Sequence, residues 1–384
     1  MDVGFLKILT AILCFQFLFV ALFLLQNKKG KSISNKLLGI VFMMLSIAVI
    51  NIYIMAYSVK IMVPQLLFLD DTFLLAYGPL LYVFTQSVIF KNYTFKRKDL
   101  LHFIPFFVVL LLFILLLLLM DTASFDETSS LLKNQNIPII FRIGELSILL
   151  HILYYLYKSK TEIKKVLGKA MEYYSSFNQD NFKLLQFILN CFIGLFSLSL
   201  IHSFLPFIGF KNVLLITMLL IVLFMLYFIN SVLLKMLNQS SNETGAMTQA
   251  KFSEQVKYAG SSLEEKDLIL LKNKLAKYMM DHEKYLDSEL NIVDLSKELN
   301  ISSKQLSQVI NEGYHCNFFD FVNKYRIDMA TSLFRNQTDT KLTISEVMYD
   351  SGFNSKSSFN TAFKKFTQKT PTQFKNDLKK GSTS

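Results

Sequence analysis

Hydrogen-bonding side chains recur near the C-terminus at positions that helices would present on one face. Asn300 stands where a sharp turn is expected, and asparagine tolerates the left-handed backbone of such a turn. Ser302 and Gln305 then have capping-box spacing and predict the start of a helix. The polar side chains on the open face of that helix are Lys304, Ser307, Gln308 and Asn311. Such groups bind base edges and phosphates, so this face predicts a contact with DNA.

A second pattern of the same kind follows later in the chain. Thr343 and Glu346 have capping-box spacing, and Gly352 supplies a turn. Asn354 is expected to cap the next helix, in which phenylalanines repeat with the period of a buried helical face. The outward residues of that helix are Lys356, Ser357, Asn360, Thr361 and Lys364.

An apolar stripe between the two patterns predicts one long connecting helix. It runs through Phe318, Phe321, Val322, Tyr325 and Met329. A single pattern of this kind is weak evidence, because short helix pairs occur in many folds. Two patterns on one connecting helix predict helix-turn-helix units at about 291–311 and 343–366. In the alternative interpretation, the polar faces are only solvated and the module binds protein.

Residues from about Tyr285 to Lys375 resemble the DNA-binding domain of the AraC/XylS family of transcription regulators. The motifs that carry the resemblance are Leu295-Ser-Lys-Glu-Leu-Asn-Ile-Ser, Asn317-Phe-Phe-Asp-Phe-Val-Asn-Lys-Tyr-Arg, Gly352-Phe-Asn-Ser-Lys-Ser-Ser-Phe-Asn and Lys369-Thr-Pro-Thr-Gln-Phe-Lys. The resemblance implies that both recognition helices enter successive segments of the major groove. The base readers that it implies are Lys304, Ser307, Gln308, Lys356, Ser357, Asn360 and Thr361. It implies phosphate-binding or structural roles for Arg326, Lys364 and Lys365.

Four positions depart from the pattern that is usual in that family. Ser296 and Met348 stand where the family usually has a small alanine. Asn300 replaces the usual turn glycine, and Gln368 replaces a common glycine before Thr370-Pro371. The larger side chain of Met348 must be accommodated between the two helices of the second unit.

The N-terminal part of the chain has the composition of a membrane protein. The whole chain is 52% hydrophobic and 18% charged, which is too apolar for an ordinary soluble protein. The apolar runs are long enough to cross a bilayer and predict seven spans, with six as the alternative count, at about 4–26, 37–57, 65–90, 100–120, 138–157, 184–207 and 213–236. The first run lacks a basic n-region and a cleavage pattern, so we interpret it as a retained helix and not a signal peptide.

The expected fold class is all-α, with a polytopic transmembrane helical bundle followed by a soluble, all-helical double helix-turn-helix domain. The predicted boundaries are 1–237 for the bundle, 238–262 for a flexible linker and 263–384 for the DNA-binding domain. A helical pattern from Ser262 to about Glu283 is interpreted as the first helix of that domain, although a dimer contact is the alternative.

Basic residues in alternate loops predict the orientation of the bundle. One set of loops holds Lys28, Lys29, Lys31, Lys36, Lys91, Lys96, Arg97, Lys98, Lys158, Lys160, Lys164, Lys165 and Lys169. With seven spans, this places the N-terminus outside and the C-terminal domain in the cytoplasm. The combination of such a bundle with an AraC-type module resembles membrane-bound regulators of bacteria, and this resemblance implies location in the bacterial inner (cytoplasmic) membrane. The net charge of +11 does not by itself distinguish DNA from anionic lipid as a partner.

Ionisable residues inside the predicted spans are candidates for sensing a ligand, because charge is costly there. They are Asp70, Asp71, Arg142, Glu145, His151 and His202. In the alternative interpretation they are structural, with Arg142 and Glu145 forming an i,i+3 pair.

No catalytic or metal-binding pattern is readable in the chain. Asp70 and Asp71 are adjacent, and neighbouring helical residues point about 100° apart. Their carboxylates are therefore not expected to converge on one substrate atom as a catalytic pair. The three cysteines show no disulfide or zinc spacing, and no phosphate-binding glycine loop occurs. We expect no enzyme activity and no cofactor, although a transporter or intramembrane enzyme with a regulatory DNA-binding tail is the alternative. The expected partners are double-stranded DNA, the lipid bilayer, a second copy of the chain, RNA polymerase and a small-molecule or envelope signal.

Overall fold

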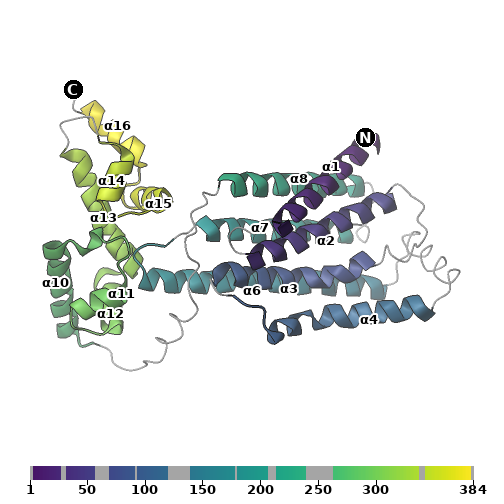
Figure 1. Cartoon of the computed structure of the whole chain (residues 1–384), viewed down its shortest axis with the longest axis horizontal. Helices are drawn as coiled ribbons and strands as arrows, with labels where there is room; N and C mark the ends of the chain where they lie inside the picture. The colour runs from purple at the N-terminus through teal and green to yellow at the C-terminus, as the bar shows by residue number, and fades with distance from the viewer. Residues whose placement is uncertain are drawn as a thin grey trace. The chain divides into compact units, whose positions relative to one another are not determined.

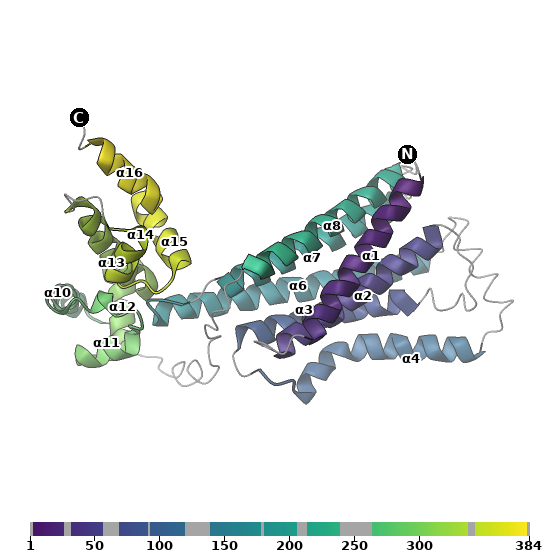
Figure 2. The same cartoon turned by 45° about the horizontal axis from the view of Figure 1, so that its top comes forward.

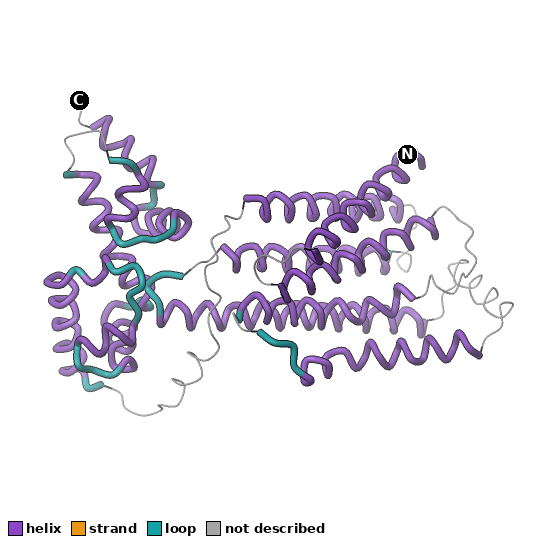
Figure 3. The backbone as a smooth tube through the Cα atoms, in the orientation of Figure 1, coloured by secondary structure: helices purple, strands orange, loops and turns teal. Residues whose placement is uncertain are grey.

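The computed structural model of the chain describes residues 3–26, 32–56, 69–90, 93–119, 139–177, 180–205, 213–238, 263–336 and 342–381. Within these ranges the regular elements are helices, as the all-α expectation requires (Figure 3). The chain forms two compact units. One comprises Met1–Ile163 and Lys183–Phe252, and the other comprises Lys164–Phe182 and Ser253–Ser384.

The first unit is a bundle of long helices (Figures 1 and 2). Its elements are α1 (Val3–Gln26), α2 (Ser32–Ala56), α3 (Leu69–Ile89), η2 (Arg97–Phe103), α4 (Ile104–Leu119), the first part of α6 (Ile139–Tyr173), α7 (Asp180–Phe204) and α8 (Leu214–Asn238). Helix α1 packs against α2 and α8, α2 packs against α3, and α3 packs against α4. Hydroxyl groups also join these helices, since Ser87 donates to Ser34 Oγ at 3.0 Å.

Six described helical segments are long and apolar enough to cross a membrane. They are Lys7–Gln26, Ile33–Asn51, Thr72–Ile89, Arg97–Leu115, Phe182–Phe204 and Leu214–Met236. They correspond to six of the seven predicted spans. Helix α6 is not among the six, so the predicted span at 138–157 stays a prediction. Large apolar side chains lie exposed on the outside of the unit, as at Leu118 (77%) and Leu119 (84%).

The second unit contains two hydrophobic cores joined by one helix. Its elements are the end of α6, α10 (Glu265–His282), η4 (Lys284–Leu286), α11 (Ile292–Glu298), α12 (Ser303–Tyr314), α13 (Phe318–Arg335), α14 (Ile344–Asp350), α15 (Lys356–Thr367) and α16 (Pro371–Gly381). Leu275 and Met279 of α10 are buried in the first core. The predicted linker lies, except for Asn238, outside the described residues.

One segment groups differently from its place in the predicted boundaries. Residues 164–182 fall inside the predicted bundle of 1–237, but in the structure they belong to the second unit. The reason is that Ser175 hydrogen-bonds to Leu290, Asn323 and Arg326. Contacts between residues so far apart in sequence leave no trace in the hydropathy pattern.

Candidate nucleic-acid interface

The first helix-turn-helix unit is built by local caps at both of its helices. The side chain of Asn291 accepts hydrogen bonds from the backbone N–H groups of Val293 and Asp294 and so begins α11. Asn300 has a φ of 50°, which confirms the predicted left-handed turn. Ser302 and Gln305 form the predicted capping box at the start of α12. These caps satisfy N–H groups that the first turn of a helix leaves unpaired.

The second unit repeats the arrangement with one difference from the prediction. Thr343 and Glu346 form the expected capping box of α14, and Gly352 makes the turn with a φ of 84°. The predicted cap of α15 at Asn354 is wrong, because Ser355 is the N-cap and accepts from the N–H of Ser358. The amide of Asn354 instead donates to Glu289 Oε1 at 3.3 Å.

Helix α13 joins the two units because it contributes to both cores. Phe318, Phe321 and Val322 are buried in the first core, whereas Ile327, Ala330 and Phe334 are buried in the second. A rigid helix with side chains in two packed cores limits the movement of one unit against the other. This arrangement gives the two recognition helices, α12 and α15, a shared frame.

The two unusual residues at family alanine positions are both accommodated. The hydroxyl of Ser296 donates to Val293 O at 2.8 Å and lies 3.0 Å from Ser303 Oγ. Met348 is 4% exposed and packs in the second core. A flexible thioether side chain fills irregular space well, which explains why the larger residue fits there.

The outer face of α12 carries the four residues predicted for it, but they differ in availability. Lys304 and Asn311 are exposed, whereas Ser307 and Gln308 are half-buried. The Gln308 amide donates to both carboxylate oxygens of Glu312, at 3.1 and 3.2 Å. Its Oε1 also accepts from the backbone N–H of Leu263 at 3.4 Å. Gln308 must exchange these partners before it can bind a base.

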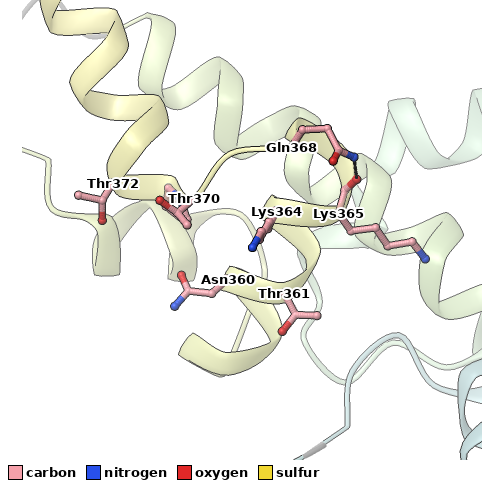
Figure 4. A pocket seen from close by; sticks show the side chains of 8 residues that line it. Asn360, Thr361, Lys364, Lys365, Gln368, Thr370 and Thr372 are labelled. Carbon is pink, nitrogen blue, oxygen red and sulfur yellow. Dashed lines mark hydrogen bonds between the residues drawn. The ribbon is translucent and has the colours of Figure 1, made fainter.

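The outer face of α15 is more open and more basic. Lys356, Asn360, Thr361 and Lys364 are exposed and Ser357 is half-buried, and α15 contains no acidic residue. Figure 4 shows a surface hollow that extends from this face to the start of α16. Its lining residues are Asn360, Thr361, Lys364, Lys365, Gln368, Thr370, Pro371 and Thr372. Thr370 and Thr372 line this hollow although the sequence pattern, which concerns α15 alone, does not predict them.

Comparisons with known proteins concern this same region. The helix-turn-helix domain family matches residues 295–377. An HTH-type transcriptional regulator of Staphylococcus aureus (strain COL) is 33% identical over 95 residues, which are 25% of this chain. This chain spans only 12% of that protein.

Two further proteins are similar to the helix-turn-helix domain. The Msm operon regulatory protein of Streptococcus mutans is 27% identical over 97 residues, which are 25% of this chain and 34% of that protein. The solved C-terminal domain of the two-component response regulator yesN from Fusobacterium nucleatum is 29% identical. That match covers 29% of this chain and 99% of the solved chain, with a TM-score of 0.24. The matches to the family and to the regulators support the AraC-type DNA-binding domain that the sequence motifs imply.

Two basic residues within the helix-turn-helix domain make internal contacts. Arg326 is 0% exposed and donates hydrogen bonds to backbone and side-chain oxygens within the domain, so its role is structural. Lys365 Nζ lies 2.6 Å from Asp320 Oδ2 and ties α15 to α13. Of the three residues with a predicted phosphate or structural role, Lys364 is therefore the one whose charge faces solvent without a described ion pair.

The candidate sensing residues lie in the helix bundle, which brings only some of them together. The side chains of Asp70, Asp71 and Arg142 lie outside the described residues. The carboxylate of Glu145 accepts a hydrogen bond from the Ser203 hydroxyl, which joins α6 to α7. His202 Nδ1 lies 2.7 Å from Thr217 Oγ1, which joins α7 to α8. Interhelical hydrogen bonds of this kind stabilise helix bundles.

His151 has a different environment from Glu145 and His202. Its ring stacks edge-on against Tyr155, with 5.0 Å between the ring centroids. Tyr155 OH in turn lies 3.0 Å from His102 Nδ1, so these residues connect α6 to η2. The structure therefore distributes the candidates over at least two places in the bundle.

Proposed function

We propose that this chain is a transcription regulator of the bacterial inner (cytoplasmic) membrane that binds specific DNA through its double helix-turn-helix domain. The observation that carries the proposal is the pair of capped units on α13, each with a polar recognition face. The proposed base and phosphate contacts are Lys304, Ser307, Gln308, Asn311, Lys356, Ser357, Asn360, Thr361 and Lys364. The family match at 295–377 supports the DNA-binding part of the proposal.

Substitution of the proposed readers tests the DNA-binding part. We expect Gln308→Ala and Asn360→Ala each to weaken binding to the selected DNA sequence by about 1 to 3 kcal/mol per lost base contact. Lys277→Ala is the control, because Lys277 is exposed on α10 and is not part of a recognition helix. Gel-shift titration of the full-length chain in detergent measures the affinities. Unchanged affinity of both reader variants would contradict the assignment of these residues.

The membrane part of the proposal is supported by the six apolar segments and by the apolar side chains exposed on the surface of the helix bundle. Exposed leucines such as Leu118 and Leu119 are favourable in lipid and unfavourable in water. We propose that α6 also crosses the membrane, as the fifth of seven spans in chain order. The N-terminus is then outside and the helix-turn-helix domain is in the cytoplasm. Reporter fusions in successive loops should then alternate between the two sides of the membrane. A six-span result would place both termini on one side.

The third part of the proposal is that the bundle couples a membrane or extracytoplasmic signal to DNA binding by shifting a conformational equilibrium. Genome-wide DNA occupancy of the full chain and of a form without the bundle tests it. We expect the two forms to differ in occupancy of the same sites. Identical occupancy under all conditions would remove support for coupling. A transporter or an intramembrane enzyme with a DNA-binding tail is the alternative. Transport of a solute or turnover of a substrate that persists when α15 is substituted would favour it.

A further inference from the structure

The connection between α6 and α7 is docked into the unit that contains the helix-turn-helix domain. Ser175 donates to Leu290 O twice, from its backbone N–H at 3.1 Å and from its hydroxyl at 2.7 Å. Tyr174 forms an antiparallel bridge with Asn291, the residue that caps α11. The Phe177 ring packs on Phe319 of α13, with 5.3 Å between centroids. We call residues 171–177 the docking strap.

The docking strap supplies partners to a buried charge. Arg326 Nη1 donates to Ser175 O at 3.1 Å, and Nη2 donates to Ser175 Oγ at 2.9 Å. The other acceptors include Tyr285 O and Asp287 O, at 2.6 and 2.8 Å. Burial lowers the pKa of Arg326 to about 10, so the guanidinium is still charged at neutral pH. A buried charge depends on such hydrogen bonds, because its water has been removed.

The same residues form the junction between the two helix-turn-helix units. The Arg326 guanidinium lies 5.6 Å from the centre of the Phe353 ring, next to the turn of the second unit. A Cβ atom on Gly352 would lie 2.7 Å from Tyr285 O, the carbonyl that accepts from Arg326. Ser176 Oγ donates to Ser288 O at 2.9 Å and lies 3.5 Å from Asn354 Oδ1. The docking strap therefore contacts the entrance of α11, the connecting helix α13 and the segment before α15.

We propose that the docking strap is the intramolecular input to the DNA-binding domain: its docking completes the junction between the two helix-turn-helix units, and its release lowers their affinity for DNA. Release removes Ser175 from Arg326 and takes both donors from Leu290 O, so the junction cannot keep its geometry. The strap includes the last three residues of α6, so a change in that helix can reach the junction along the chain. The effect on DNA rests on the proposed function, whereas the docking itself does not.

The experiment uses the full-length chain in lipid nanodiscs and compares two leucine substitutions. Ser175→Leu puts a larger apolar side chain into a site that is 0% exposed and removes the hydroxyl. Glu172→Leu, at an exposed position near the end of α6, is the matched control. Hydrogen exchange is followed in peptides that cover the docking strap and residues 290–295. Affinity is measured for the duplex that the wild-type chain selects from a random pool.

We expect Ser175→Leu to speed amide exchange in both peptides and to weaken duplex binding, each by about tenfold or more, because several buried hydrogen bonds are lost together. Glu172→Leu should leave both quantities within about twofold of wild type, as is usual for an exposed position. If Ser175→Leu does not fold, Ser175→Ala removes only the hydroxyl and should shift both quantities in the same direction by a smaller factor.

Each other result overturns a defined part of the inference. Unchanged exchange in the peptide of residues 290–295 overturns the docking. Faster exchange with unchanged duplex affinity overturns the role as input to DNA binding. If the wild-type chain selects no duplex, the proposed DNA-binding function fails, while the exchange measurement still tests the docking strap on its own.

Discussion

The two helix-turn-helix units make the same kind of turn under different constraints. Asn300 turns the first unit with a φ of 50° and is exposed, so its side chain has free space. Gly352 turns the second unit with a φ of 84°, and a Cβ there would lie 2.7 Å from Tyr285 O and 2.8 Å from Leu286 Cα. The first turn is limited by backbone conformation alone, whereas the second is also limited by its packing against the first unit. The comparison shows that the junction depends more on the second turn.

The recognition faces differ as well. Helix α12 carries Lys304 and Glu312, and the Glu312 carboxylate holds the Gln308 amide. Helix α15 carries Lys356, Lys364 and Lys365 and no acidic residue. A phosphate backbone attracts lysines and repels carboxylates. We therefore expect α15 to contribute more of the electrostatic part of DNA binding than α12 does.

The largest expected effect comes from placing alanine at each of the two turns. Gly352→Ala should destabilise the domain by about 2 to 4 kcal/mol, because the new Cβ meets backbone atoms and the left-handed conformation is strained. Asn300→Ala should cost about 1 kcal/mol or less, since only the conformational preference changes. Hydrogen exchange of the core amides in the full-length chain measures both. Equal losses would remove the distinction between the two turns.

A smaller effect is expected from removing one lysine from each recognition helix. Lys364→Ala should weaken DNA binding by roughly 1 kcal/mol and lower the slope of log affinity against log salt by about 1. Lys304→Ala should have a smaller effect on the salt slope, because Glu312 already offsets positive charge on that helix. Titrations at several salt concentrations give the slopes. A larger loss of slope in the Lys304 variant would reverse the proposed ranking of the helices.

Removal of the acidic residue from α12 should bring the two faces closer together. Glu312→Gln takes away a charge that repels phosphate and leaves the Gln308 amide with one neutral acceptor in place of two carboxylate oxygens. We expect DNA affinity to rise by up to about 1 kcal/mol, the size typical of exposed charge interactions. Asp281→Asn is the control for net charge, because Asp281 is exposed at the end of α10. An equal rise in both variants would show only an effect of total charge.

The smallest expected effect is a gain of stability at a third left-handed position. Gln368 has a φ of 60° at the end of α15, where glycine has no steric penalty. Gln368→Gly should stabilise the domain by about 0.5 to 1 kcal/mol. Asn300→Gly should change stability less, because asparagine already tolerates this conformation. Thermal unfolding of the full-length chain, monitored by hydrogen exchange, compares the two variants. A loss of stability in the Gln368 variant would contradict the strain at that position.

Much of the fold could be predicted because its determinants are local. The caps at Asn291, Ser302 and Thr343 and the turn at Gly352 lie where the sequence places them, since each requires side-chain contacts within a few residues. The cap of α15 was assigned one residue early, to Asn354. Asparagine and serine both cap helices well, and the contact of Asn354 with Glu289 is not local.

The sequence by itself determined that the chain has an apolar N-terminal part and a polar C-terminal part. It also determined the all-helical elements and the outward positions of the proposed readers. Only the tertiary structure decided that Gln308 Oε1 already accepts from the backbone N–H of Leu263, 45 residues earlier. It also decided that Arg326 is buried and that Ser175, 151 residues earlier, supplies its partners. The physical reason is that periodicity and caps are properties of neighbouring residues, whereas the satisfaction of a buried charge depends on whatever the folded chain brings beside it.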